Sequence, residues 1–202
     1  DATRPRLTWY DADGSRIELS AKVLAMWVTN AANLLTEEGD VGPGDTVVLL
    51  LPPAHWRAAY WALATWSVGA TLSVSPDPAA AALITTDPLL AAEDSAPLRL
   101  VVTEAALARR YDGALPLGVV DEAAELALYG DRFDPPRTPA PADVALVSDR
   151  ETWTYTDVVP APNGVGRAPR QHLDGSTATV TWLREALAAW AASMPMGPGP
   201  MT

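Results

Sequence analysis

The sequence predicts an α/β fold, an open and mostly parallel sheet with helices on both faces. The first observation is a strand–helix–strand unit over residues 41–74, and the second is the alternation of short apolar runs with short helical segments after it. The third is the continuous apolar run at 46–51, which is typical of a strand covered on both faces. We therefore expect the fold to form around this unit, with a right-handed crossover.

The central unit is predicted element by element. Pro43 and Gly44 indicate a turn, after which residues 46–51 form the buried strand. Two prolines end that strand, because proline has no amide hydrogen for the ladder and suits a helix start. Apolar residues at helical spacing then predict a helix over 54–68, and Gly69 fits the position just past its end. Residues 70–74 are the return strand.

The segment before this unit predicts a hairpin and a helix. Residues 7–10 and 16–19 have strand character and flank a turn sequence that contains Asp and Gly. Ser20 is a natural N-cap, because its hydroxyl can accept a hydrogen bond from a first-turn amide. One apolar stripe predicts a helix over 21–38 that ends at Gly39.

Shorter elements are predicted for the remainder of the chain. Before the proline-rich linker at 134–141 we expect a short helix after Asp77, strands at 82–86, 99–103 and 117–120, and helices at 88–93, 104–110 and 121–129. After the linker we expect strands at 144–147, 152–155 and 177–181 and a helix at 182–193. The predicted division is a first α/β lobe at 1–134, then a linker and the start of a second lobe at 135–202.

Composition limits the compartment and the partners. The 202 residues carry a formal net charge of −11, which disfavours nucleic acid and anionic membranes as partners. There is no cysteine, and hence no disulfide and no thiolate ligand. The first 19 residues are polar, and no apolar run is long enough to cross a bilayer, so we expect a cytoplasmic protein.

Three short motifs carry a resemblance to a known superfamily. They are Gly42-Pro43-Gly44-Asp45, Leu51-Pro52 and Gly69-Ala70, at separations that resemble the N-terminal region of the adenylate-forming enzymes. Those enzymes are the acyl-CoA synthetases, peptide-synthetase adenylation domains and luciferases. The chain resembles more closely a short actinobacterial AMP-ligase-like family of unknown function. The resemblance covers residues 7–134 and implies the N-terminal subdomain of these enzymes, followed by a degenerate piece of the second lobe.

The same resemblance indicates which catalytic groups adenylation requires. The superfamily supplies a phosphate loop that ends in Pro-Lys-Gly and a second lysine late in the chain, whereas Lys22 is the only lysine among these 202 residues. The sequence therefore predicts a truncated, non-catalytic relative with a binding or scaffold role, with no catalytic residue and no cofactor. The alternative is an enzyme that binds a nucleotide such as ATP or AMP, or another small molecule, at the 174–179 loop through Gly175, Ser176 and Thr177.

Other candidate site residues are few. His55 lies in the first turn of the helix after the central strand, where α/β proteins often bind ligands. It either lines a pocket or is a solvent-facing or locally satisfied histidine. Because His55 and His172 are the only histidines, a histidine-rich metal site is excluded and no metal is expected. Asp121, Glu122 and Glu125 are interpreted as acidic residues that favour a helix start, not as a catalytic carboxylate pair.

The tryptophans on the predicted helices leave two alternatives. Trp61 lies off the stripe of its helix, which indicates a helix buried on more than one side. Exposed aromatic residues also mark interfaces, so the other alternative is a homodimer or a protein partner that contacts the helix surfaces around Trp61 and Trp190.

Overall fold

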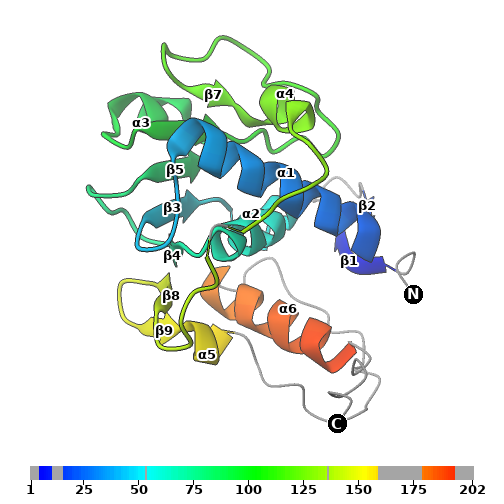
Figure 1. The fold of residues 1–202 in the computed structure, drawn as a ribbon. Coiled ribbons are helices and arrows are strands. Elements are labelled where there is room, and N and C mark those ends of the chain that lie inside the picture. Colours follow the sequence, from blue (N-terminus) through cyan, green and yellow to red (C-terminus); the bar gives the residue numbers. More distant parts are fainter. Residues whose placement is uncertain (1–4, 11–15, 53, 136, 159–178, 194–202) are drawn as a thin grey trace, which may run out of the picture.

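The fold is a mixed α/β structure with one large sheet and a separate hairpin (Figure 1). The computed structural model describes residues 5–10, 16–52, 54–135, 137–158 and 179–193. The large sheet has the strand order β7-β6-β5-β3-β4-β8-β9, and every pairing in it is parallel except that of β8 with β9. The predicted fold class is confirmed. The strands are β1 Pro5–Tyr10, β2 Arg16–Ser20, β3 Thr46–Leu50, β4 Thr71–Ser73, β5 Ala82–Thr85, β6 Leu98–Val101, β7 Val120–Asp121, β8 Val144–Val147 and β9 Thr152–Thr154.

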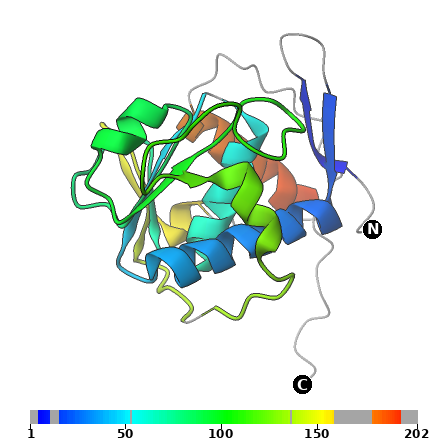
Figure 2. The ribbon, with the colours of Figure 1, turned by 90° about the horizontal axis from the view of Figure 1, so that it is seen from above.

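Helices cover both faces of the sheet (Figure 2). They are α1 Ala21–Gly39, α2 Trp56–Ser67, α3 Pro88–Glu93, α4 Glu122–Glu125, the 3-10 helix η1 Leu126–Leu128, α5 Tyr155–Val158 and α6 Thr179–Ser193. α1 packs along α2, and α4 and η1 lie against α1 on the same face. α3 lies against β5 and β6 on the opposite face.

β3 is the central strand of the sheet, as predicted. Its side chains alternate between two buried clusters, with Val47 and Leu49 in the main core and Val48 in a smaller cluster on the other face. Leu49 is 1% exposed. A strand that is covered on both faces needs no polar alternation, and this explains the continuous apolar run.

The motifs of the family resemblance form the turn before β3 and the return to β4. The carboxylate of Asp45 accepts a hydrogen bond from the amide of Gly42 at 2.8 Å, and this closes the turn. Gly69 has a φ of +83°, and a side chain there would lie 3.0 Å from Cγ of Pro43. Glycine is therefore required at this position both by its conformation and by the close approach of the turn. The motifs in this chain stabilise the fold.

The hairpin and the first helix form as predicted, apart from the helix end. The Ser20 hydroxyl accepts from the amide of Val23 at 3.3 Å and caps α1. The helix includes Gly39, and the left-handed residue after it is Asp40 with a φ of 50°. The helix is thus one residue longer than the predicted range 21–38, and Gly39 is its last residue. Asp is among the few side chains that tolerate this conformation.

Three predicted elements beyond residue 74 are wrong. The segment after Asp77 is a turn, because the Asp77 carboxylate accepts from the amide of Ala79 at 2.9 Å and competes with helix formation. Residues 104–110 form turns and no helix, and Leu107 there is 83% exposed, so no apolar face is buried to stabilise one. Residues 179–181 begin α6 and not a strand, because burial of Trp182 against the core outweighs the strand preference of threonine.

The sheet continues past the proline-rich linker. β8 pairs in parallel with β4, and β9 returns antiparallel to β8 as the edge strand. Trp66 ties this part to α2, because its indole nitrogen donates to the carbonyl of Ala145 at 2.7 Å. Residues 159–178 and 194–202 lie outside the described part, so the predicted second lobe stays a prediction.

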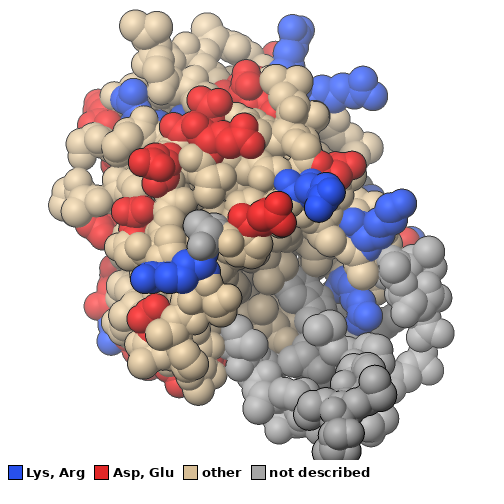
Figure 3. Space-filling model, in the orientation of Figure 1, with Lys and Arg blue, Asp and Glu red and all other residues tan. Residues whose placement is uncertain are grey.

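The charged side chains at the surface agree with the acidic composition of the chain. Acidic side chains gather over α1 and α4 in the view of Figure 3. Tyr129 lies among them, and its hydroxyl donates to Glu38 at 3.0 Å. Burial and the nearby Glu38, Glu125 and Glu37 raise the pKa of Tyr129 above its usual range.

Within the described helices, none has the length and apolarity that crossing a membrane requires.

We expect Leu49→Asp to prevent stable folding. An unpaired carboxylate at the centre of the core costs several kcal/mol, against a total stability of about 5–15 kcal/mol for a domain of this kind. Leu89→Asp on α3 is the matched control, because Leu89 is 71% exposed. Urea unfolding followed by circular dichroism measures both variants, and equal midpoints would contradict the central position of Leu49.

Candidate functional site

The strand order marks one edge of the sheet as the place for a site. The chain passes from β3 to β4 on one side and then places β5 on the other side of β3. In open α/β sheets, ligands bind outside the carboxyl ends of strands at such a reversal. The segments here are residues 51–55 after β3 and residues 86–87 after β5. We call this region the carboxyl edge.

The loop between β3 and α2 is tightly held. The amide of His55 donates to the carbonyl of Pro52 at 3.2 Å, and Ala54 has a φ of 58°, a left-handed conformation that is uncommon for alanine. Nδ1 of His55 accepts from the amide of Arg57 at 3.3 Å, so His55 is the N-cap of α2. Its side chain is buried. Nδ1 of His55 is thus used in a local hydrogen bond, and a pocket at His55 stays a prediction.

Aromatic rings fill the space around this loop. The ring of Trp9, from β1, meets that of His55 edge-on at 5.1 Å between centroids. Trp56 lies 6.2 Å from His55 on the other side, and Trp27 of α1 contacts Trp56 at 6.1 Å. Tyr60 lies under Trp27, with its ring stacked at 5.6 Å. The carboxyl edge near α2 is thus packed with the protein's own side chains.

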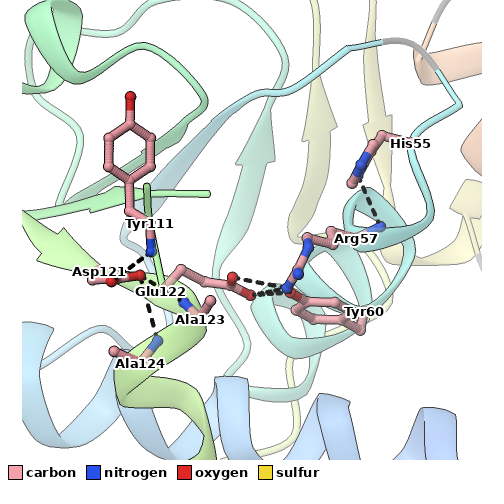
Figure 4. Close-up of polar contacts among 8 residues, drawn as sticks. All are labelled: His55, Arg57, Tyr60, Tyr111, Asp121, Glu122, Ala123 and Ala124. Carbon is pink, nitrogen blue, oxygen red and sulfur yellow. Dashed lines mark hydrogen bonds and ion pairs between the residues drawn. The ribbon is translucent and has the colours of Figure 1, made fainter. Parts of the chain in front are cut away.

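A buried ion pair lies beside these rings and joins Arg57 to Glu122 (Figure 4). Nη1 of Arg57 donates to both carboxylate oxygens of Glu122, at 2.9 and 3.2 Å. The hydroxyl of Tyr60 also donates to Glu122, and its oxygen lies 3.4 Å from Nη1 of Arg57. Arg57 is 2% exposed, and Tyr60 and Glu122 are fully buried. The pair joins α2 to α4 across the core.

Asp121 positions Glu122. One carboxylate oxygen of Asp121 caps α4 by accepting from the amides of Ala123 at 3.1 Å and Ala124 at 3.4 Å. The other accepts from the amide of Tyr111 at 2.8 Å and ties the preceding loop to the start of α4 (Figure 4). The sequence interpretation of Glu122 as a residue at a helix start is correct, because Glu122 begins α4. It did not include the ion pair that the Glu122 carboxylate forms with Arg57.

Burial controls the ionisation of the cluster. It raises the pKa of Glu122, although Arg57 and the hydrogen bond from Tyr60 lower it. Burial also raises the pKa of Tyr60 well above its usual value, and the Glu122 carboxylate adds to this. Burial lowers the pKa of Arg57, but Tyr60 and Glu122 raise it by more than burial lowers it. The pKa of Arg57 therefore lies above its usual value, and the guanidinium stays charged. Tyr60 therefore remains a neutral donor at physiological pH.

The β5 side of the carboxyl edge is also used internally. Asp87 accepts from the amides of Leu89 at 2.8 Å and Leu90 at 3.3 Å, and so caps α3. The hydroxyl of Thr85 accepts from the amide of Asp87 at 3.1 Å. In the described part of the chain, no group of three or more His, Cys, Asp or Glu side chains is arranged to hold a metal ion.

The remaining predicted site residues are not brought to this edge by any described contact. Gly175, Ser176 and Thr177 lie outside the described residues, as does His172. Arg57 and Tyr60 were missed as polar site residues. The signal for them was an arginine inside an otherwise apolar helix, which requires a buried partner. Its partner is 65 residues away, so spacing alone does not identify it.

Trp61 lies inside the protein. The side chain is fully buried between layers, which confirms burial on more than one side of α2. The Trp61 side chain itself therefore offers no exposed surface, and the homodimer or protein partner stays a prediction. The side chain of Trp190 lies outside what the structure describes.

Comparisons with known proteins agree with this architecture. The fold is similar to that of an acyl-CoA synthetase from Brucella canis, with a TM-score of 0.60, 20% identity and coverage of 73% of this chain and 29% of that one. It is also similar to the amide bond synthetase McbA from Marinactinospora thermotolerans, with a TM-score of 0.55, 17% identity and coverage of 92% and 40%. The fold is that of adenylate-forming enzymes.

A curated relative gives the link at the sequence level. A protein of Mycobacterium tuberculosis described as a TIGR03089 family protein is 39% identical over 147 residues, which are 70% of this chain. The match spans about 60% of that relative's length. No protein-family model matches the sequence. The resemblance to an actinobacterial family and to adenylate-forming enzymes is confirmed.

We expect the buried pair to show strong coupling in a double-mutant cycle of Arg57→Met and Glu122→Gln. Each single change leaves a buried polar partner without its counterpart and should cost about 3–5 kcal/mol, whereas the double variant should lose much less than their sum. Arg16 and Glu18, which are largely exposed, form the control pair, whose coupling should stay below about 1 kcal/mol. Additive losses at the buried pair would contradict the interaction.

The pH dependence of the Arg57→Met variant follows from the raised pKa of Glu122. When the folded pKa lies above the unfolded value, the folded state holds the proton more tightly, and stability falls as pH rises between the two values. Loss of the Arg57 cation raises the folded pKa further and widens this window above 4.5. Arg57→Met should therefore be less destabilising in acid than at neutral pH. Urea unfolding at several pH values measures this, and Arg57→Met/Glu122→Gln should lack the added dependence.

Proposed function

We propose that this chain is a non-catalytic member of the adenylate-forming fold that acts by binding or scaffolding. The main observation behind this proposal is that side chains of the protein itself fill the carboxyl edge. His55, Trp56 and Arg57 are all buried there. In a ligand-binding α/β protein, groups at this edge converge on the ligand. Here the N-cap, the ring contacts and the ion pair already use them.

The balance of charge supports the same proposal. Stabilising a triphosphate during adenylation requires positive charge aimed at the phosphates. Arg57 is the cation buried at this edge, and Glu122 neutralises it at 2.9 Å. Lys22, the only lysine among the 202 residues, is exposed on the first turn of α1. The net charge of −11 further disfavours a polyanionic ligand.

The chain corresponds to only part of each protein to which it is similar. It spans about 60% of the curated relative and 29–40% of the two enzymes described above. The reactions named for those enzymes are theirs. For this chain we propose that the α/β lobe has kept the architecture and acts without the reaction, in the cytoplasm, alone or with a protein partner.

Calorimetric titration of the chain with ATP and with AMP tests the proposal. We expect no saturable heat with either nucleotide, and pyrophosphate exchange with a panel of carboxylic acids should stay at background. Saturable nucleotide binding that Ser176→Ala abolishes would contradict the proposal and favour the alternative at the 174–179 loop. Ser148→Ala is the control, because the Ser148 hydroxyl accepts from the amides of Arg150 and Glu151 in the β8–β9 turn.

A further inference from the structure

The β1–β2 hairpin is structurally separate from the main sheet. Its two strands pair only with each other in the described part of the chain, and the hairpin stands at one end of the molecule beside the start of α1 (Figure 2). An isolated two-stranded hairpin is marginal in water, so its stability depends on the face it packs against the core. That face meets the carboxyl edge.

The hairpin has one inner and one outer face. Ile17 and Leu19 are buried in the main core, while Leu7 and Trp9 are half-buried against it. Tyr10, the next residue along β1, points away from the core and is 58% exposed. In the described part of the chain, these apolar side chains pack the hairpin against the core, and neither strand forms ladder hydrogen bonds with β3 or its neighbours.

Trp9 covers the groups at which this fold class binds ligands. Its ring meets His55 at 5.1 Å and an interplanar angle of 61°. Behind His55 lies the ring of Trp56, and the guanidinium carbon of Arg57 is 4.6 Å from the centroid of that ring. The indole of Trp9 is thus a planar aromatic group held against a surface of rings at the carboxyl edge.

We propose that the hairpin is a displaceable strap and that the place of Trp9 beside His55 is a binding slot for a planar aromatic group. The strap closes the slot with the chain's own indole, and an aromatic ligand competes with Trp9 for it. This rests on the proposed binding role, because it names the ligand chemistry of the same edge. A ligand that binds only the open state shifts the population toward it in proportion to its concentration.

Native-state hydrogen exchange on the full chain tests the strap. In the wild-type protein, amides of β1 and β2 should exchange through a local opening, faster than those of β3 and β5, which exchange through global unfolding. Trp9→Ala should speed exchange in the hairpin by about tenfold or more and leave β3 within about twofold. Tyr10→Ala is the matched control and should change neither. Equal exchange of hairpin and β3 amides in the wild type would overturn the strap.

Indole is the probe for the slot. It should bind the Trp9→Ala variant at millimolar concentration and shift the ring signals of His55 in the NMR spectrum. It should bind the wild type and the Tyr10→Ala variant more weakly, because the closed strap reduces the fraction of molecules that can accept it. Equal binding to all three proteins, or no binding to Trp9→Ala, would overturn the slot.

The two proposals fail separately. A hairpin that opens only on global unfolding removes the strap and leaves the absence of adenylation standing. Saturable ATP binding abolished by Ser176→Ala removes the non-catalytic role, whatever the hairpin does.

Discussion

The guanidinium of Arg57 carries a positive charge in the middle of the molecule, on a helix whose other faces are occupied by apolar and aromatic side chains. Its burial is tolerable only because Glu122 supplies the opposite charge and Tyr60 supplies a further hydrogen bond. Glu122 in turn depends on α4, which begins where Asp121 caps it. The ion pair therefore links the short α4 to the central helix, in addition to the packing of η1 against α1.

The motifs that reveal the resemblance form turns: Asp45 closes the turn before β3, and Gly69 makes room for Pro43. Such residues are needed by any protein with this architecture, whether or not it catalyses a reaction. At the carboxyl edge, where function resides in an α/β protein, Nδ1 of His55 and Nη1 of Arg57 bind groups of the chain itself.

The hairpin and the ion pair close the same edge in different ways. The pair is fully buried and links two helices, so it opens only at the cost of exposing a charge network. Trp9 of the hairpin places a half-buried indole on the outer side of His55. The hairpin itself is a two-stranded sheet separate from the large sheet. The proposed strap would make binding at this place depend on local opening of the hairpin.

The sequence by itself determined the central architecture. The apolar run of β3, the helical spacing of α2, the Ser20 cap and the glycine at position 69 are local signals, because each follows from the conformational preference or the hydrogen bonds of a few consecutive residues. The same reasoning failed at residues 104–110, where good helix formers bury no apolar face, and at 179–181, where burial of Trp182 decided the conformation.

Only the tertiary structure decided the candidate site. Arg57 and Glu122 are 65 positions apart, and Trp9 and His55 lie on a hairpin and a helix cap that no spacing rule connects. A buried charge indicates that a partner exists, but several carboxylates satisfy that requirement in an acidic chain. Which of them meets the arginine depends on where the crossovers place α2 and α4, and this is fixed by the packing of the whole core.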